Sequence, residues 1–268
     1  LAHYMSLRNL RNLAARESAH ALLDESGLQE RFLAALPFAL TNAQQRVVAE
    51  LKADLQDAHP MMRLIQGDVG CGKTVVALLS SAIVADNGGQ IAVIAPTEIL
   101  ARQHYKSMKE LADLVGLKVE LLLGGLKGDG RETLLNKVKN GEVQLLIGTH
   151  AIIQPDIKFK NLGLVVIDEQ HRFGVEQRKA LLDKGNHPHI LAMTATPIPR
   201  TLAITYHGDM DVTIIGELPG NRQPIKTFVV NSDQEERIYN FIRKEVDNGN
   251  QCFIVYPIIE ESEKLDLK

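Results

Sequence analysis

The sequence predicts an α/β fold in which a parallel β-sheet is covered by helices. Two observations support this class. Over residues 37–216, short runs of Val, Ile and Leu alternate with segments of helical periodicity. The apolar runs are continuous rather than alternating, which is typical of strands that are buried on both faces of a parallel sheet.

The expected elements follow in chain order. Residues 1–35 have the apolar spacing of helices, with a break near Ser26 and Gly27. Thr41 is a favourable N-cap for a helix over residues 42–55, because its hydroxyl can accept a free N–H of the first turn. Further helices are expected at 74–86, 98–115 and 131–139, and strands at 64–65, 91–95, 119–123, 143–147, 164–167 and 190–193.

A segment rich in Gly and Pro, residues 216–224, predicts a linker. After it we expect a strand at 227–230, a helix capped by Ser232 or Asp233, and a strand at 253–256. This pattern resembles the opening of a second α/β domain, since about 45 residues are too few to bury such a core alone. The chain also starts at Leu1 rather than Met, so a longer parent protein is expected.

Composition excludes several classes of protein. The 268 residues are 45% hydrophobic and 24% charged, which is ordinary for a globular chain and not for a disordered or collagen-like one. No apolar run approaches the roughly 20 residues of a membrane span, and no secretory leader is expected. The net charge of −3 argues against a wholly basic surface but not against a local nucleic-acid strip. The two cysteines, Cys71 and Cys252, suit a reducing cytosol and argue against a disulfide scaffold or zinc cluster.

The stretch from Gly67 to Thr74 matches the P-loop pattern G-x-x-x-x-G-K-[ST], between an expected strand and an expected helix. Its backbone N–H groups would surround phosphate, Lys73 would neutralise the β- and γ-phosphates, and Thr74 would place a hydroxyl on Mg²⁺. Cys71 is interpreted as a small residue whose backbone matters more than its thiol. The expected nucleotide-binding residues of this loop are Gly67, Asp68, Val69, Gly70, Cys71, Gly72, Lys73 and Thr74.

An apolar strand at 164–167 ends in two acids, Asp168 and Glu169. In P-loop enzymes, an acid at a strand end near the P-loop holds Mg²⁺, and the next acid can orient or deprotonate the attacking water. Solvated carboxylates at a strand end are the alternative. The P-loop about 95 residues earlier favours the catalytic interpretation.

Residues 168–171, Asp-Glu-Gln-His, resemble the DExH box of superfamily 2 helicases and translocases. The other motifs of that superfamily have counterparts in the expected order. Residues 40–44 resemble the Q-type motif, in which Gln44 would contact adenine. Residues 95–104, 148–150 and 194–196 resemble motifs Ia, Ib and III.

The longer blocks at 168–175 and 193–201 resemble the RecG family of bacterial branched-DNA translocases and the related transcription-repair coupling factor. Gln170, the Pro-Thr-Glu-Ile-Leu form of motif Ia, and the segments 217–222 and 256–265 favour the RecG family. RNA helicases usually carry Asp-Glu-Ala-Asp where this chain has residues 168–171, and Ser-Ala-Thr where it has residues 194–196, so an RNA helicase is less favoured. The resemblance covers residues 37–268 and is weak to absent over 1–36.

The resemblance implies a domain plan: a helical connecting segment at 1–36, a RecA-like helicase lobe at 37–216, a linker at 217–224, and the start of a second RecA-like lobe at 225–268. It implies ATP and Mg²⁺ as cofactors, with Mg²⁺ on Thr74 and Asp168. The catalytic residues would be Lys73, Asp168, Glu169 and His171.

The resemblance also implies contacts to the DNA backbone from Thr97, Arg102, Thr149, His150 and Arg200. Each has a structural alternative, such as an N-cap for Thr97 and a solvated helix face for Arg102. Thr194 and Thr196 would couple nucleotide state to DNA binding through a hydrogen bond to an acid or a histidine, with His171 as the natural partner. Turn capping before Pro197 is the alternative.

By resemblance, the intact protein would be an ATP-dependent helicase that regresses stalled forks and migrates Holliday junctions in recombination and repair. Its substrate would be branched double-stranded DNA, and single-stranded DNA-binding protein would be a further partner. The protein would be a monomer in the bacterial cytoplasm, associated with the nucleoid. Motifs V and VI, with the arginine finger, belong to the second lobe, and no wedge domain is expected before residue 37. The chain alone is therefore expected to bind nucleotide and hydrolyse it poorly. Two alternatives stay open: the coupling factor, with RNA polymerase as partner, and a nucleotide-binding module without turnover.

Overall fold

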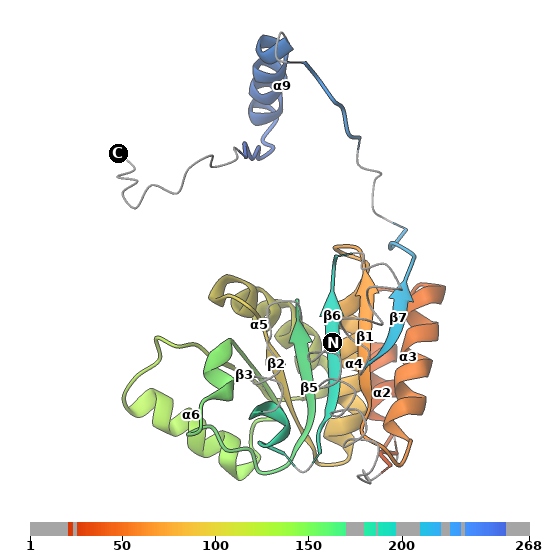
Figure 1. Cartoon of the computed structure of the whole chain (residues 1–268), viewed down its shortest axis with the longest axis vertical. Coiled ribbons are helices and arrows are strands. Elements are labelled where there is room, and N and C mark those ends of the chain that lie inside the picture. Colours follow the sequence, from red (N-terminus) through yellow and green to blue (C-terminus); the bar gives the residue numbers. More distant parts are fainter. Residues whose placement is uncertain are drawn as a thin grey trace, which may run out of the picture. The chain divides into compact units, whose positions relative to one another are not determined.

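The computed structural model describes residues 21–23, 26–169, 180–185, 187–196, 210–220, 226–231 and 234–255 (Figure 1). The chain divides into two compact units, residues 1–222 and 223–268. The division falls inside the Gly- and Pro-rich segment that the sequence marks as a linker. The sheet and the residues predicted to carry function lie in the first unit.

The first unit is built on a seven-stranded sheet in the order β3-β4-β2-β5-β6-β1-β7, with parallel pairing throughout the described strands. This confirms the predicted α/β class. The strands are β1 (Met62–Gly67), β2 (Gln90–Ile94), β3 (Val119–Leu122), β4 (Leu145–Gly148), β5 (Leu162–Asp168), β6 (His189–Thr194) and β7 (Asp211–Ile215). Six of them were predicted, with bounds that differ by up to two residues.

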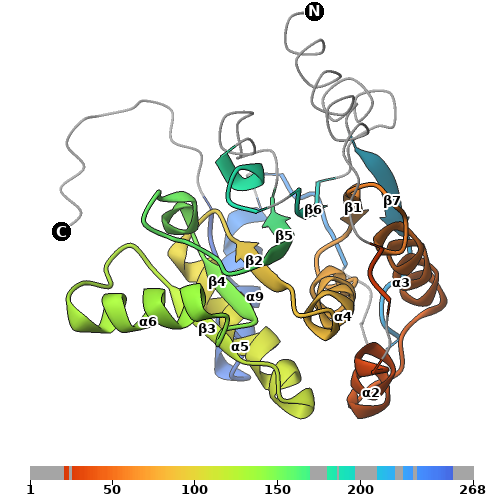
Figure 2. The ribbon, with the colours of Figure 1, turned by 90° about the horizontal axis from the view of Figure 1, so that it is seen from below.

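Helices cover both faces of this sheet. Those described are α2 (Leu28–Ala35), α3 (Asn42–Leu55), α4 (Lys73–Asp86), α5 (Glu98–Ala112) and α6 (Asp129–Asn140), with 3₁₀ turns η1 (Asp113–Val115) and η2 (His150–Ile153). One apolar cluster joins α2, α3, α4 and α5 to one face, where α4 and α5 lie on the same side of the strands (Figure 2). A second cluster joins α6 and η2 to the other face.

The two clusters explain the continuous apolar runs of the strands. Along β2, Ile91 and Val93 pack into the first cluster, whereas Ala92 and Ile94 pack into the second. Successive side chains of a strand point to opposite faces, so a strand with helices on both sides is apolar on both faces along its centre.

Helix α4 is buried along most of its length, from Val75 to Val84. Its two buried serines satisfy their hydroxyls within the helix, because Ser80 Oγ donates to Val76 O and Ser81 Oγ to Ala77 O, at 3.1 and 2.8 Å. A helix this apolar on all sides belongs in the centre of a layered fold. It therefore fixes the loop that precedes it at Gly67–Gly72.

The N-cap prediction for α3 is confirmed. Thr41 Oγ1 accepts the Gln44 N–H at 3.2 Å, and Gln44 Oε1 accepts the Thr41 N–H at 2.8 Å, which completes a capping box. The break predicted near Ser26 and Gly27 is also present, because Gly27 has a φ of 65° immediately before α2.

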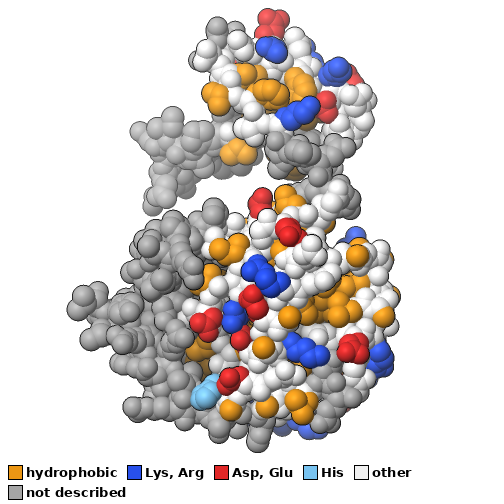
Figure 3. Space-filling model, turned by 90° about the vertical axis from the view of Figure 1, so that its right-hand side faces the viewer, with side chains coloured by type: hydrophobic (Ala, Val, Ile, Leu, Met, Phe, Trp, Pro, Cys, Tyr) orange, Lys and Arg blue, Asp and Glu red, His pale blue; other side chains and the backbone are white. Residues whose placement is uncertain are grey.

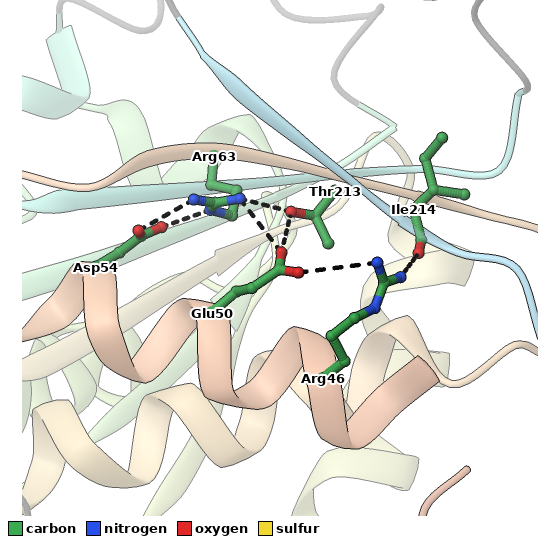
Figure 4. Close-up of polar contacts among 6 residues, drawn as sticks. All are labelled: Arg46, Glu50, Asp54, Arg63, Thr213 and Ile214. Atoms are coloured by element: carbon green, nitrogen blue, oxygen red, sulfur yellow. Dashed lines mark hydrogen bonds and ion pairs between the residues drawn. The ribbon is translucent and has the colours of Figure 1, made fainter. Parts of the chain in front are cut away.

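A polar network fastens α3 to the sheet (Figure 4). Arg63 of β1 donates to the Asp54 carboxylate of α3 through Nε and Nη2, at 2.5 and 3.0 Å. Its Nη1 donates to Thr213 Oγ1 of β7 at 2.6 Å, and that hydroxyl donates to Glu50 Oε2 at 2.7 Å. The Arg63 guanidinium is half-buried and is held in one orientation by its several partners. The network therefore fixes the position of α3 against β1 and β7.

Strand β7 was not predicted from the sequence. It pairs with β1 at the edge of the sheet, with Arg63 opposite Asp211 and Gly67 opposite Ile215, and Arg46 Nη2 of α3 donates to Ile214 O at 2.8 Å. The β-branched run of residues 212–215 is the signal that could have predicted it.

The second unit, described by itself, contains α9 (Glu235–Asp247). Apolar side chains of this unit are exposed, including Tyr239, Phe241 and Val246 (Figure 3). The strands predicted at 227–230 and 253–256 were wrong over the described residues, which form neither strand nor helix. A strand forms only against a neighbouring strand, and the described part of this unit provides none. Gln234 is the N-cap of α9, without a side-chain cap, and the predicted caps Ser232 and Asp233 lie outside the described residues.

Burial of His189 predicts acid sensitivity of the first unit. The ring is 4% exposed at the start of β6, where Nδ1 accepts the Met61 N–H at 3.0 Å, and burial lowers its pKa from 6.5 to about 4. Between pH 6.5 and pH 4, His189 is protonated in the unfolded chain but not in the folded one. The free energy of unfolding is therefore highest above pH 6.5 and falls as the pH drops toward 4. Because the two states bind the proton of His189 differently, we expect the free energy of unfolding to fall by about 2 kcal/mol from pH 7 to pH 5.

Urea unfolding at pH 7 and pH 5 measures this effect. His189→Asn keeps a side-chain acceptor without the titration, so the variant should lose about 2 kcal/mol less than the unmodified chain over this pH range. Equal losses in the two proteins would contradict the prediction.

Candidate functional site

The predicted site residues that the structure describes gather at the carboxyl edge of the sheet. In the strand register, Gln66 of β1 lies opposite Thr194 of β6, and Asp168 of β5 lies opposite Met193. Ile94 of β2 lies opposite both Ile167 of β5 and Gly148 of β4. The loops after these five adjacent strands therefore leave the sheet at the same level, where open α/β sheets bind ligands.

The P-loop turn joins β1 to the N-terminus of α4. Gly70 and Gly72 have φ values of 79° and 89°, a region that favours glycine. Lys73 Nζ donates to Gly67 O at 2.6 Å and to Asp68 O at 3.0 Å, so the ammonium lies across the mouth of the loop. A loop of this shape presents backbone N–H groups and a positive helix end to an anion.

Gln44 lies against this loop rather than in solvent. It is buried, and its Nε2 donates to Cys71 O at 2.8 Å while its Oε1 serves the capping box of α3. A Cβ on Gly72 would come within 2.1 Å of Gln44 Nε2. A side chain at this position would displace the Gln44 amide, and the positive φ favours glycine as well.

A pocket of about 680 Å³ opens beside Gln44 and the P-loop. Its walls come from the segment before α3, the start of α3, the first turn of α4, the C-terminal half of α5 and the residues after β7. The lining residues include Phe38, Leu40, Thr41, Gln44, Gly72, Thr74, Leu111 and Pro219. A mostly apolar pocket beside a phosphate-binding loop suits the base of a nucleotide.

Glu217 was not predicted as a site residue. Its Oε2 accepts the Ala43 N–H at the first turn of α3, at 3.0 Å. A carboxylate there complements the helix dipole and fixes the segment after β7 against the helix that carries Gln44. The contact joins residues 174 positions apart, and only the tertiary fold identifies it.

The two acids at the end of β5 have different environments. Asp168 is buried as the last residue of the strand, whereas Glu169 has a φ of 51°, an uncommon conformation for a residue with a side chain. The Glu169 carboxylate accepts Thr194 Oγ1 and the Ala195 N–H, both at 3.3 Å. Strained backbone of this kind is typical of functional sites, where surrounding contacts hold it in place.

The predicted coupling residues Thr194 and Thr196 contact each other through their hydroxyls at 2.9 Å. Within the described residues, the hydrogen-bond partner of Thr194 at the DExH box is an acid, Glu169. The sequence left an acid or a histidine open. His171, the partner it favoured, lies outside the described residues, as do Gln170 and Arg200.

Asp168 has a partner that the sequence did not single out. His104 Nε2 of α5 lies 2.7 Å from Asp168 Oδ2, and both side chains are mostly buried. Asp168 Oδ1 accepts the Glu169 N–H at 3.1 Å. Since each carboxylate oxygen accepts two hydrogen bonds or metal contacts, capacity for a cation remains.

The predicted DNA contacts among the described residues follow β2 and β4 at the same edge. Thr97 is the N-cap of α5 and is exposed; its Oγ1 accepts the Leu100 N–H at 3.3 Å, so the structural alternative is present as well. Arg102 is exposed on α5. Thr149 precedes η2 without a side-chain cap, and His150 is exposed beside it.

The donors at this edge suit Mg²⁺. Within the described ranges no cluster of three His, Cys, Asp or Glu side chains could hold a metal by itself. Magnesium in nucleotide sites needs only one or two protein oxygens, because phosphate oxygens and water complete the octahedron. The Thr74 hydroxyl and the Asp168 carboxylate are such oxygens. No helix among the described residues is long and apolar enough to cross a membrane.

Comparison with known proteins agrees with this geometry. The sequence model of the DEAD/DEAH box helicase family matches residues 41–204. The chain is 54% identical over 241 residues to ATP-dependent DNA helicase RecG of Synechocystis sp., covering 90% of this chain and 29% of that protein. It is 49% identical over 257 residues to ATP-dependent DNA helicase RecG of Bacillus subtilis, covering 95% of this chain and 38% of that protein.

Among solved structures, RecG bound to a three-way DNA junction superposes with a TM-score of 0.85 at 42% identity, over 96% of this chain and 34% of that one. DUF1998 helicase MrfA superposes with a TM-score of 0.60 at 19% identity, which shows the fold alone. The chain thus spans about a third of the length of the curated relatives that it matches.

Proposed function

The chain belongs to the DEAD/DEAH box helicase family, and we propose that it is the nucleotide-binding lobe of an ATP-dependent helicase that translocates on branched DNA. One observation carries the proposal. Glu169, at the DExH box, is hydrogen-bonded to Thr194 of motif III at the sheet edge that also holds the P-loop. The relatives named RecG, one of them bound to a three-way junction, support branched DNA as the substrate.

Each residue at this edge of the sheet would have a separate role in ATP hydrolysis. Lys73 would move from the carbonyls of Gly67 and Asp68 to the β- and γ-phosphates, where its charge is needed. When bound, Mg²⁺, held by Thr74 and Asp168, would neutralise phosphate charge. Glu169 would accept a proton from the attacking water, with the Thr194 hydroxyl and the Ala195 N–H orienting its carboxylate.

The nucleotide and DNA residues lie along one edge, and their proximity supports coupling between the two ligands. Thr97 and Thr149 follow β2 and β4, and β2 is the neighbour of β5, which carries the two acids. Hydroxyl and imidazole donors such as these read phosphate oxygens rather than bases. DNA binding should therefore be salt-dependent and nearly independent of sequence.

ATP turnover on different nucleic acids tests the proposal. We would compare a three-way junction, a linear duplex and an RNA, using this chain and a protein extended by the segments of the relatives that it does not cover. Strong junction-stimulated turnover is expected in the extended protein and little in this chain, since an arginine finger contributes about 10³–10⁵ in rate.

Two results would count against the proposal. An extended protein that binds ATP normally but shows no stimulation by any DNA would indicate a nucleotide-binding module without turnover. Stimulation by RNA but not by the junction would refute the DNA substrate.

A further inference from the structure

His104 is a largely buried side chain at the sheet edge, and the proposed hydrolysis scheme gives it no role. It lies about two turns into α5, and its Nε2 is 2.7 Å from Asp168 Oδ2. The side chains are 13% and 11% exposed, so the contact is largely shielded from water. The two residues are 64 positions apart and come from different elements.

The direction of this hydrogen bond follows from its acceptor. A carboxylate oxygen is the acceptor in this hydrogen bond, so His104 Nε2–H is the donor to Asp168 Oδ2. Hydrogen bonds to a charged acceptor are shorter and about twice as strong as neutral ones. The Glu169 N–H holds Oδ1 at 3.1 Å, and His104 holds Oδ2, so the two donors together fix the plane of the carboxylate.

A fixed carboxylate plane matters for a cation that is held by few protein atoms. Magnesium demands near-ideal octahedral geometry, and a freely rotating carboxylate would have to be ordered at each binding event. Partners that orient a metal ligand are typically worth 10–100-fold in metal affinity.

Helix α5 adds a second consequence. Its N-cap is Thr97, one of the proposed DNA contacts, and it contacts Asp168 through His104. A helix is stiff over this length of about 10 Å. If a bound DNA strand displaced the N-terminus of α5, His104 would move with the helix and would shift the Asp168 carboxylate that holds the cation.

We propose that His104 is a positioning residue that orients Asp168 for Mg²⁺ and links the helix of motif Ia to the nucleotide site. The inference rests on the proposed function, because it assigns His104 to a nucleotide-bound Mg²⁺. It concerns a residue that neither the P-loop nor the DExH box contains.

The test is the gain in nucleotide affinity that Mg²⁺ provides. Binding of a fluorescent, non-hydrolysable ATP analogue to the full chain would be measured with excess Mg²⁺ and with EDTA. We expect His104→Ala to reduce the Mg²⁺-dependent gain about tenfold while affinity in EDTA is unchanged. His104→Gln, whose amide can replace the Nε2 donor, should restore most of the gain, and Asp168→Asn should remove it.

The matched control is His59→Ala, since His59 is exposed beside Asp57 in the turn that leads into β1. Far-UV circular dichroism would establish that each variant is folded. An undiminished Mg²⁺ gain in His104→Ala, or an equal loss with Mg²⁺ and EDTA, would overturn the positioning role alone. Failure of the unmodified chain to bind the analogue at all would instead overturn the proposed function.

Discussion

Lys73→Ala is expected to produce the largest loss of function in this protein. Lys73 Nζ already lies across the P-loop, 2.6 Å from Gly67 O, and no other residue of the loop carries a positive charge. A hydrogen bond to a charged group is worth about 1.5–3 kcal/mol, so the affinity for ATP should fall about 10–100-fold. Turnover should fall by a further factor of about 10²–10³, because the ammonium also stabilises the transition state.

Equilibrium binding of a fluorescent ATP analogue to this chain, and steady-state hydrolysis by the extended protein, measure the two effects. Lys139→Ala is a matched control, because Lys139 is exposed in the last turn of α6, which leads to the start of β4 at the opposite edge of the sheet. Wild-type affinity in the Lys73 variant would remove the P-loop assignment, and with it the basis of the proposed function.

Glu169→Gln is expected to separate binding from chemistry. Glutamine keeps the shape of the side chain: its Oε1 can accept the Ala195 N–H and its Nε2 can donate to Thr194 Oγ1, so the local structure should persist. It cannot accept a proton from water. General-base catalysis contributes about 10²–10⁴-fold, so turnover should fall by that factor while ATP affinity stays near the wild-type value.

Pre-steady-state and steady-state hydrolysis in the extended protein, with analogue binding alongside, measure this separation. Glu142→Gln serves as the control, because Glu142 is exposed in the turn between α6 and β4. If the Glu169 variant lost binding and turnover in equal proportion, its carboxylate would have a structural role, and another group would have to serve as the base.

The structure also explains why Glu169 and Thr194 belong to one unit. β5 and β6 are neighbours in parallel register, so the loops that follow them leave the sheet side by side. The Thr194 hydroxyl contacts Thr196 as well as Glu169. A shift in the position of the Glu169 carboxylate would therefore move the segment after β6 through these two threonines. This provides a physical route for the coupling role that the motif order implied.

Much of the fold could be predicted because its signals are local. The capping box of α3 depends on Thr41 and Gln44, three residues apart, and the burial of β2 on both faces is visible in five consecutive residues. The P-loop is likewise a contiguous pattern, Gly67 to Thr74, whose glycine conformations follow from the residue types. These features need no knowledge of distant neighbours.

The errors came from elements that depend on such neighbours. The segments at 227–230 and 253–255 have strand-like composition but no paired strand among the described residues, whereas β7 forms because β1 lies beside it. The contacts of His104 with Asp168 and of Glu217 with Ala43 join residues 64 and 174 positions apart.

The sequence by itself therefore determined the class of the fold, the nucleotide-binding loop and the order of the motifs. Only the tertiary structure decided which side chains meet at the sheet edge: His104 with Asp168, Thr194 with Glu169, and Glu217 with α3. The physical reason is range. Periodicity, capping and glycine conformation act over a few residues, whereas a hydrogen bond between separate elements depends on strand order and register, which are set by the packing of the whole sheet.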